Sequence, residues 1–169
     1  MPRRPSSCSP WPVHGWRQSA SQSASQSVRK RGRPVAAPDA PRVLVVEDND
    51  LNYQLVAFVL SRLGLSVLRA ADAEAALDLA TSERPDLIYM DIQLPGTDGL
   101  EVTRRLKASS ATCNVPVIAL TAFAMVGDEE KALAAGCDGY LTKPVSPQQL
   151  RAVTQRFLRQ SNAGEDHSG

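Results

Sequence analysis

Side chains that could carry out chemistry follow apolar runs in the middle of this 169-residue chain: Glu47, Asp48, Asp91, Thr121 and Lys143. The two histidines, His14 and His167, lie near the ends of the chain. The middle of the chain therefore offers no imidazole as a base, nucleophile or metal ligand. We expect carboxylates to carry any reaction.

Three carboxylates at one site repel one another, and a bound cation commonly relieves such repulsion. Oxygen ligands without imidazole or thiolate favour a hard ion such as Mg²⁺. The three cysteines include no C-x-x-C pair that would indicate a zinc site. Because Mg²⁺ usually joins one or two carboxylates to a phosphate, the predicted site also needs a phosphate.

The phosphate could belong to a nucleotide or be a covalent phosphoryl group. Neither G-x-x-x-x-G-K-[ST] nor G-x-G-x-x-G follows the first apolar run, so no nucleotide-binding loop is indicated. The covalent alternative remains: an aspartate attacks a phosphoryl donor while the metal and Lys143 neutralise charge on the transferred oxygens. Thr121 offers a hydroxyl to one of those oxygens.

Alternating elements must position these residues. Five short apolar runs predict strands: 43–46, 65–68, 87–90, 115–120 and 140–141. Five amphipathic segments predict helices: one between Asn49 as N-cap and Gly64, then 73–83, 100–108, 129–135 and 146–160. Strict alternation of strand and helix predicts a doubly wound α/β domain, a parallel sheet with helices on both faces. Its ligand crevice should lie at the carboxyl ends of the strands.

The chain divides into three parts by composition. Residues 1–41 contain seven Lys or Arg against one acid, seven of the twelve prolines and no Leu, Ile or Phe, which predicts a disordered basic arm. Residues 42–160 form the predicted domain, and residues 161–169 read as a disordered tail. No run approaches the roughly 18 apolar residues of a membrane span, and no secretory signal is evident. We therefore expect no membrane association and a cytoplasmic location.

Four blocks together resemble the receiver domain of bacterial response regulators: Val45–Asn49, Tyr89–Gly96, Leu120–Met125 and Gly139–Pro144. The resemblance spans residues 42–160 and is greatest to single-domain DivK-type regulators and to the receivers of hybrid histidine kinases. It implies the CheY-like, flavodoxin-like (βα)5 fold, with a parallel sheet of order 2-1-3-4-5.

The resemblance also implies roles for the acidic residues. Asp91 would be the phosphoacceptor, forming 4-aspartylphosphate. Asp48, Asp91 and the backbone carbonyl of Gln93 would be Mg²⁺ ligands, and Glu47 would be the second acid of the pocket, acting on the metal indirectly.

Four further residues match the family pattern near the carboxyl ends of the last two strands. Lys143 would contact the phosphoryl group, and Pro144 would follow it through a cis peptide bond. Thr121 and Tyr140 would be the switch pair that reshapes the surface of the fourth helix, fifth strand and fifth helix.

These roles imply a two-component, phosphorelay signalling protein rather than an enzyme, although such a domain assists its own phosphorylation and dephosphorylation. A histidine kinase or histidine phosphotransfer protein would act upstream, and an unknown protein target downstream. Only eleven residues follow Leu158, so we expect a stand-alone receiver without a C-terminal DNA-binding domain.

A DNA-associated regulator is one alternative. Lys30–Pro34 resembles the core of an AT-hook, in which Arg31 and Arg33 would enter the minor groove of A·T-rich DNA. A plain solvated arm is the simpler interpretation, because basic runs are common in such segments.

An aspartate-nucleophile phosphatase is the enzyme alternative, with the same Mg²⁺ and lysine. Haloacid-dehalogenase-type enzymes carry a second acid two positions after the nucleophile, where this chain has Gln93. Without that acid, protonation of the leaving group lacks its usual donor.

Overall fold

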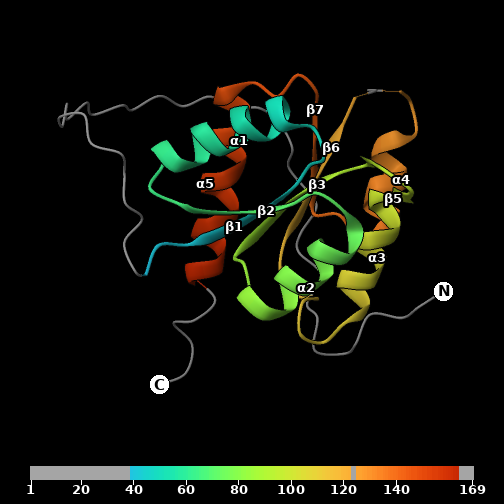
Figure 1. Cartoon of the computed structure of the whole chain (residues 1–169), viewed down its shortest axis with the longest axis horizontal. Coiled ribbons are helices and arrows are strands. Elements are labelled where there is room, and N and C mark those ends of the chain that lie inside the picture. Colours follow the sequence, from blue (N-terminus) through green and yellow to red (C-terminus); the bar gives the residue numbers. More distant parts are fainter. Residues whose placement is uncertain (1–38, 123–124, 164–169) are drawn as a thin grey trace.

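A five-stranded parallel sheet forms the centre of the computed structural model, which describes residues 39–122 and 125–163 (Figure 1). Its order is β2-β1-β3-β6-β7. The strands are β1 (Arg42–Val46), β2 (Ser66–Ala70), β3 (Leu87–Asp91), β6 (Val117–Thr121) and β7 (Gly139–Thr142). This confirms the doubly wound fold and the predicted order 2-1-3-4-5. Arg31 and Arg33 lie outside the described residues.

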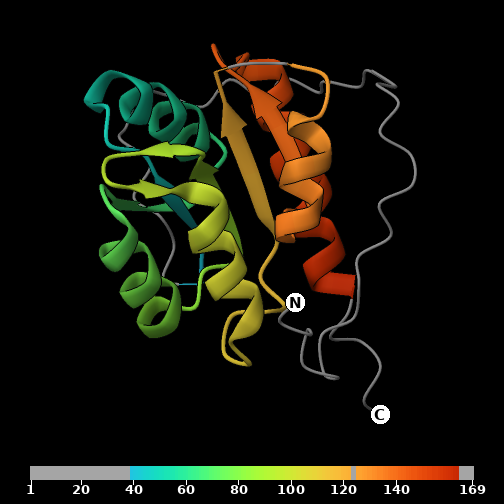
Figure 2. The same ribbon diagram turned by 90° about the vertical axis from the view of Figure 1, so that its right-hand side faces the viewer.

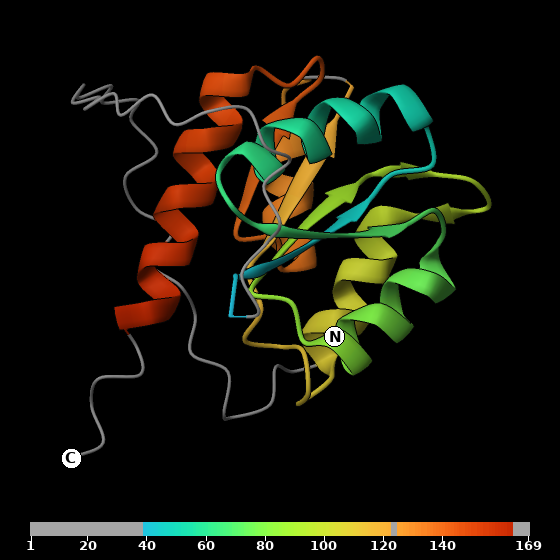
Figure 3. The ribbon, with the colours of Figure 1, turned by 60° about the vertical axis from the view of Figure 1, so that its left-hand side comes forward.

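Five helices cover the two faces of the sheet (Figures 1 and 3). On one face lie α1 (Asp50–Arg62) and α5 (Pro147–Ala163), and on the other lie α2 (Ala73–Glu83), α3 (Gly99–Ala108) and α4 (Asp128–Ala135). None of the helices in the described part of the chain combines the length and apolar character needed to cross a membrane.

Side-chain alternation along β1 divides the core into two layers. Val43 and Val45 pack with α1 and α5, while Leu44 and Val46 pack with α2, α3 and α4. All four valine and leucine side chains are fully buried. A strand buried on both faces explains why the sequence shows a continuous apolar run here rather than alternation.

Asparagine and aspartate side chains begin the first three helices. The Asn49 side-chain oxygen accepts from the backbone N–H groups of Leu51 (3.0 Å) and Asn52 (3.2 Å), confirming the predicted cap of α1. Asp72 caps α2 and Asp98 caps α3 in the same way. These bonds satisfy N–H groups that the first turn of a helix leaves free.

Three features differ from the sequence-based expectation. A two-stranded antiparallel ribbon, β4 (Gln93–Leu94) and β5 (Thr97–Asp98), follows β3 and was not predicted (Figure 2). The β6 ladder begins at Val117 rather than at residue 115, because Pro116 has no N–H to donate. Helix α5 continues to Ala163, three residues past the predicted end.

Candidate functional site

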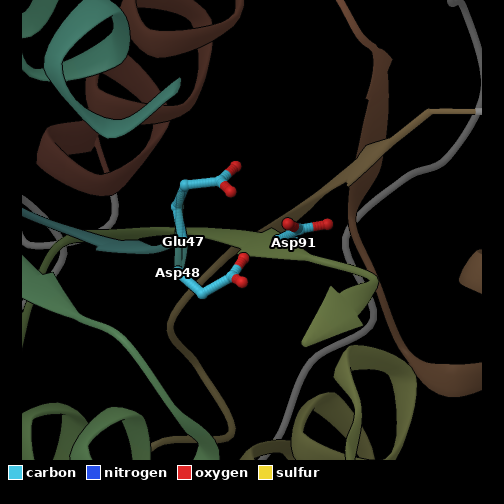
Figure 4. A group of neighbouring side chains, drawn as sticks. All are labelled: Glu47, Asp48 and Asp91. Atoms are coloured by element: carbon cyan, nitrogen blue, oxygen red, sulfur yellow. The ribbon is translucent and has the colours of Figure 1, made fainter. Parts of the chain in front are cut away.

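Three carboxylates meet at the carboxyl ends of β1 and β3 (Figure 4). The strands are neighbours, with Val46 paired to Met90, so the residues that follow on β1 lie beside Asp91. One oxygen from each of Glu47, Asp48 and Asp91 lies within 4.8 Å of the others. Glu47 and Asp91 are 1% and 3% exposed, whereas Asp48 is exposed. The pocket therefore has two buried acids and one at its mouth.

Lys143 brings the positive charge to this pocket. Its ammonium lies 2.7 Å from Glu47 Oε2 and donates to Asp91 Oδ2 at 2.8 Å. The backbone N–H of Lys143 donates to the carbonyl of Thr121 at 2.7 Å, which fixes the lysine to the end of β6. The Lys143–Pro144 peptide bond is cis, as the resemblance implied.

Burial and charge act against each other on the Glu47 carboxyl group. Burial raises the pKa of Glu47, and the nearby Asp91 charge raises it further, whereas the Lys143 ammonium and the hydrogen bond from the Asn49 N–H lower it. The net pKa shift is upward. Glu47 Oε2 has no hydrogen-bond partner of good geometry among the described residues, and its contact with Lys143 is an ion pair.

The Lys143 ammonium stays charged in this setting. Burial by itself would lower the pKa of Lys143, but the hydrogen bond that Lys143 donates to Asp91 and the negative charges of Asp91 and Glu47 outweigh that effect, and the net pKa shift is upward. A fixed cation beside a carboxylate nucleophile can neutralise the charge of an incoming phosphoryl group.

Backbone contacts fix the Asp91 carboxylate from the other side. Its Oδ1 accepts from the Gln93 N–H at 2.9 Å, and Gln93 begins the unpredicted ribbon. The Ile92 N–H donates to the Leu120 carbonyl at 3.0 Å, so the chain beyond Asp91 remains attached to the sheet. The Gln93 side chain is exposed. Asp91 therefore has one oxygen held by backbone and the other held by lysine.

Gly99 is a residue of this site that sequence reasoning missed. A Cβ placed on Gly99 would lie 2.0 Å from the Asp91 carbonyl oxygen, far closer than atoms can approach. Its N–H donates to the Ile92 carbonyl at 2.8 Å. A glycine directly after the capping Asp98, at the first position of a helix, was the available signal, since a helix start does not itself require glycine.

Thr121 is the last residue of β6, and Tyr140 lies in the neighbouring strand β7; the switch role expected of them stays a prediction. Leu120 pairs with Asp91 across β3 and β6, so Thr121 follows one residue beyond the phosphoacceptor candidate, and it is buried. Tyr140 is half-buried, and its hydroxyl donates to Glu129 Oε2 at 3.2 Å. Burial and the Glu129 charge raise the pKa of Tyr140. The hydroxyl of Tyr140 thus connects β7 to the first turn of α4.

The donor set fits Mg²⁺. The cluster offers oxygen ligands alone, which suits a hard divalent cation. Within the described ranges, Glu47, Asp48 and Asp91 are the group of acids close enough together to hold a metal ion. The buried Oε2 of Glu47, which is ion-paired with Lys143 and accepts no hydrogen bond of good geometry from the described residues, is a further acceptor in this group. Asp48 and Asp91 would supply direct ligands, with Glu47 behind them.

Comparison with known proteins agrees with this geometry. The profile of the family described as "Response regulator receiver domain" matches residues 43–155. The polar-differentiation response regulator DivK of Brucella anthropi is 50% identical over 116 residues, which cover 69% of this chain and 94% of DivK.

Solved structures of receivers share the fold. The receiver domain of a sensor histidine kinase from Pseudomonas aeruginosa, solved with a magnesium ion coordinated in its active site cleft, aligns with a TM-score of 0.66 at 39% identity. That alignment covers 71% of this chain and 98% of the other. The chemotaxis response regulator CheY4 of Vibrio cholerae aligns with a TM-score of 0.67 at 31% identity, covering 70% and 99%.

Proposed function

We propose, from the premise that this chain belongs to the response regulator receiver domain family, that Asp91 accepts a phosphoryl group from a histidine kinase or histidine phosphotransfer protein. The single observation that carries the proposal is the setting of Asp91. Its carboxylate lies at the carboxyl end of β3, 2.8 Å from the Lys143 ammonium and grouped with Glu47 and Asp48.

The transfer forms one bond and breaks one. A carboxylate oxygen of Asp91 bonds to phosphorus while the phosphorus–nitrogen bond of the donor phosphohistidine breaks, and the electron pair remains on the imidazole, which takes up a proton. Lys143 neutralises charge on the transferred oxygens, and the Thr121 hydroxyl donates to one of them. Mg²⁺, held by Asp48, Asp91 and the Gln93 carbonyl, would supply further charge neutralisation.

The output in this proposal is a change of surface. A phosphoryl group adds charge and acceptor oxygens beside Thr121, and this local change biases the face of α4, β7 and α5 between two states. The Tyr140–Glu129 hydrogen bond supports the proposal, because it joins β7 to α4 at the switch residue. A downstream protein that prefers one state would read the signal.

The phosphatase alternative gains no support from the site. Gln93, at the position where a dehalogenase-type enzyme carries its second acid, is an exposed amide that cannot protonate a leaving group. The DNA-binding alternative rests on Arg31 and Arg33, which are not among the described residues.

Reductive trapping tests the assignment of Asp91. The full chain is incubated with acetyl phosphate and Mg²⁺ and then treated with borohydride, which converts an aspartyl phosphate to homoserine. Peptide mass spectrometry should find homoserine at position 91 in the phosphorylated sample and unchanged aspartate after incubation with EDTA. Homoserine at position 48, or at neither position, would overturn the proposal.

A further inference from the structure

Arg69 on β2 contacts the loop that carries the exposed acid of the pocket. Its Nη2 forms an ion pair with Asp50 and donates to the backbone carbonyl of Asp48 at 3.4 Å. Its guanidinium carbon lies 4.6 Å from the centre of the Tyr53 ring. One side chain therefore connects β2, the loop after β1 and the first turns of α1.

The register of the sheet explains this placement. Arg69 pairs with Val45 on β1, and two residues earlier on β2 Val67 packs against the core under α1 and α5. Because side chains alternate along a strand, Arg69 projects to the same face as Val67, toward α1. Tyr53 lies one turn into α1 and gives the guanidinium an aromatic surface to stack on.

Asp48 differs from the other two acids in how it is held. Lys143 contacts both Glu47 and Asp91, the Asn49 N–H donates to Glu47, and the Gln93 N–H donates to Asp91. Among the described residues, Arg69 is the residue whose side chain donates a hydrogen bond to Asp48, and it donates to the backbone carbonyl of Asp48.

We propose that Arg69 is a positioning residue that holds the β1–α1 loop so that Asp48 presents its carboxylate at the distance Mg²⁺ requires. The inference rests on the proposed function, since it takes Asp48 as a metal ligand. Mg²⁺ demands near-octahedral geometry with oxygens at about 2.0–2.1 Å, whereas Ca²⁺ accepts more ligands at about 2.3–2.6 Å in looser arrangements. A loosened Asp48 should therefore harm Mg²⁺ binding more than Ca²⁺ binding.

Variants of Arg69 can separate the effect of its charge on cation binding from its effect on the position of Asp48. Removing the arginine alone leaves Asp50 unpaired near the pocket, and the added negative charge favours any cation. The double variant Arg69→Gln/Asp50→Asn keeps the net charge of the pair. It removes the ion pair and the bond from the guanidinium to the Asp48 carbonyl. Arg62→Gln is a matched control, because Arg62 also stacks on an aromatic ring of α1, that of Phe58, at 5.7 Å.

The experiment is an amide NMR titration of the full chain with Mg²⁺ and, separately, with Ca²⁺. It compares the wild type, Arg69→Gln/Asp50→Asn, Asp50→Asn and Arg62→Gln. We expect the double variant to bind Mg²⁺ about 10-fold more weakly than the wild type, the low end of the effect for residues that support a metal ligand from behind. Its Mg²⁺ to Ca²⁺ affinity ratio should fall, while Arg62→Gln keeps the wild-type ratio.

The outcomes separate this inference from the proposed function. A wild type that binds Mg²⁺ at residues 47–50 and 91–93, with an unchanged ratio in the double variant, would overturn the role of Arg69 and leave the proposed function standing. Equal loss of both ions would also overturn it, because only the local position of Asp48 discriminates between them. A wild type without any Mg²⁺-dependent shift would overturn both.

Discussion

The ammonium of Lys143 lies 2.8 Å from the carboxylate of Asp91, although 52 residues separate them in the chain. The same ammonium is 2.7 Å from Glu47, which is 1% exposed. Lys143 thus places one positive charge between two buried acids at the ends of neighbouring strands. We expect this contact to stabilise the pocket before any phosphoryl group or metal enters.

Lys143→Ala should lower the free energy of unfolding when Mg²⁺ is absent. Glu47 and Asp91 would then be buried close together without a cation, at a cost of about 2 kcal/mol. Added Mg²⁺ should restore most of the loss, because a ligand that binds the folded state stabilises it. Urea unfolding in EDTA and in Mg²⁺ measures both effects.

Lys131→Ala is the control for Lys143→Ala, since Lys131 pairs with Asp128 at the surface of α4 and is 72% exposed. The free energy of unfolding of Lys131→Ala should stay within about 0.5 kcal/mol of the wild-type value in both buffers. Equal free energies of unfolding for the two lysine variants in EDTA would contradict the stabilising role given to Lys143.

Gly99→Ala should distort the site and destabilise the fold. The new methyl group would meet the Asp91 carbonyl at 2.0 Å, and the backbone on one side would have to move. We expect a loss of about 3 kcal/mol together with slower phosphorylation of the folded fraction. Urea unfolding and acetyl phosphate labelling of the same samples measure the two effects.

Gly64→Ala is the comparison for Gly99→Ala. Gly64 has a φ of +80° and open space around its Cβ position, so alanine should cost only about 1 kcal/mol, for its left-handed backbone, and leave labelling unchanged. If Gly99→Ala were as stable and as readily phosphorylated as Gly64→Ala, the close approach to Asp91 would have no consequence.

Local patterns predicted the acids of the site well. Glu47, Asp48 and Asp91 follow buried apolar runs, and the carboxyl ends of parallel strands necessarily meet at one edge of the sheet. The cap at Asn49 could also be predicted, because a capping side chain bonds to backbone groups within its own segment.

Two contacts between distant segments could not be predicted from the sequence. Gly99 matters because of the Asp91 carbonyl, and Lys107 pairs with Asp138 across 31 residues. In both cases the residue type fits an ordinary helix, and the constraint comes only from the tertiary neighbour. The β4–β5 ribbon was missed because its strands are two residues each, too short for a periodic signal.

Lys107→Met should cost about 3 kcal/mol of stability without impairing phosphorylation. The Lys107 ammonium donates to Asp138 Oδ2 at 2.7 Å and to the Val115 carbonyl at 2.7 Å, and both charged side chains are about 95% buried. Removing the lysine leaves a buried carboxylate without its cation, at the edge of the sheet opposite the pocket. Urea unfolding and acetyl phosphate labelling measure the two properties.

The double variant Lys107→Met/Asp138→Asn should recover part of that stability, because no buried charge remains unpaired. Lys131→Met, at the exposed pair, should change stability by less than about 0.5 kcal/mol. A Lys107→Met variant as stable as Lys131→Met would show that the buried pair is energetically neutral.

Cys137 should make stability fall at alkaline pH. Burial, with the Asp138 charge as a lesser cause, raises the pKa of the Cys137 thiol from 9.0 to about 11. Between those values the unfolded chain releases a proton that the folded protein keeps, so unfolding becomes easier as pH rises. The free energy of unfolding should drop by about 1.4 kcal/mol between pH 8 and pH 10 on this account.

Cys137→Ala isolates the thiol from the other alkaline groups, including Tyr89 and Tyr140, whose pKa values are also raised. The difference in unfolding free energy between wild type and variant should shrink from pH 8 to pH 10. A difference that does not vary with pH would contradict the upward shift of the Cys137 pKa.

Intact-mass measurement of the full chain tests the central claim most directly. The wild type, Asp91→Asn and the control Asp78→Asn, which changes an exposed acid of α2, are incubated with acetyl phosphate in Mg²⁺ or in EDTA. We predict one phosphoryl group on wild type and on Asp78→Asn, only with Mg²⁺, and none on Asp91→Asn. A phosphoryl adduct on Asp91→Asn equal to that of the wild type would contradict the account.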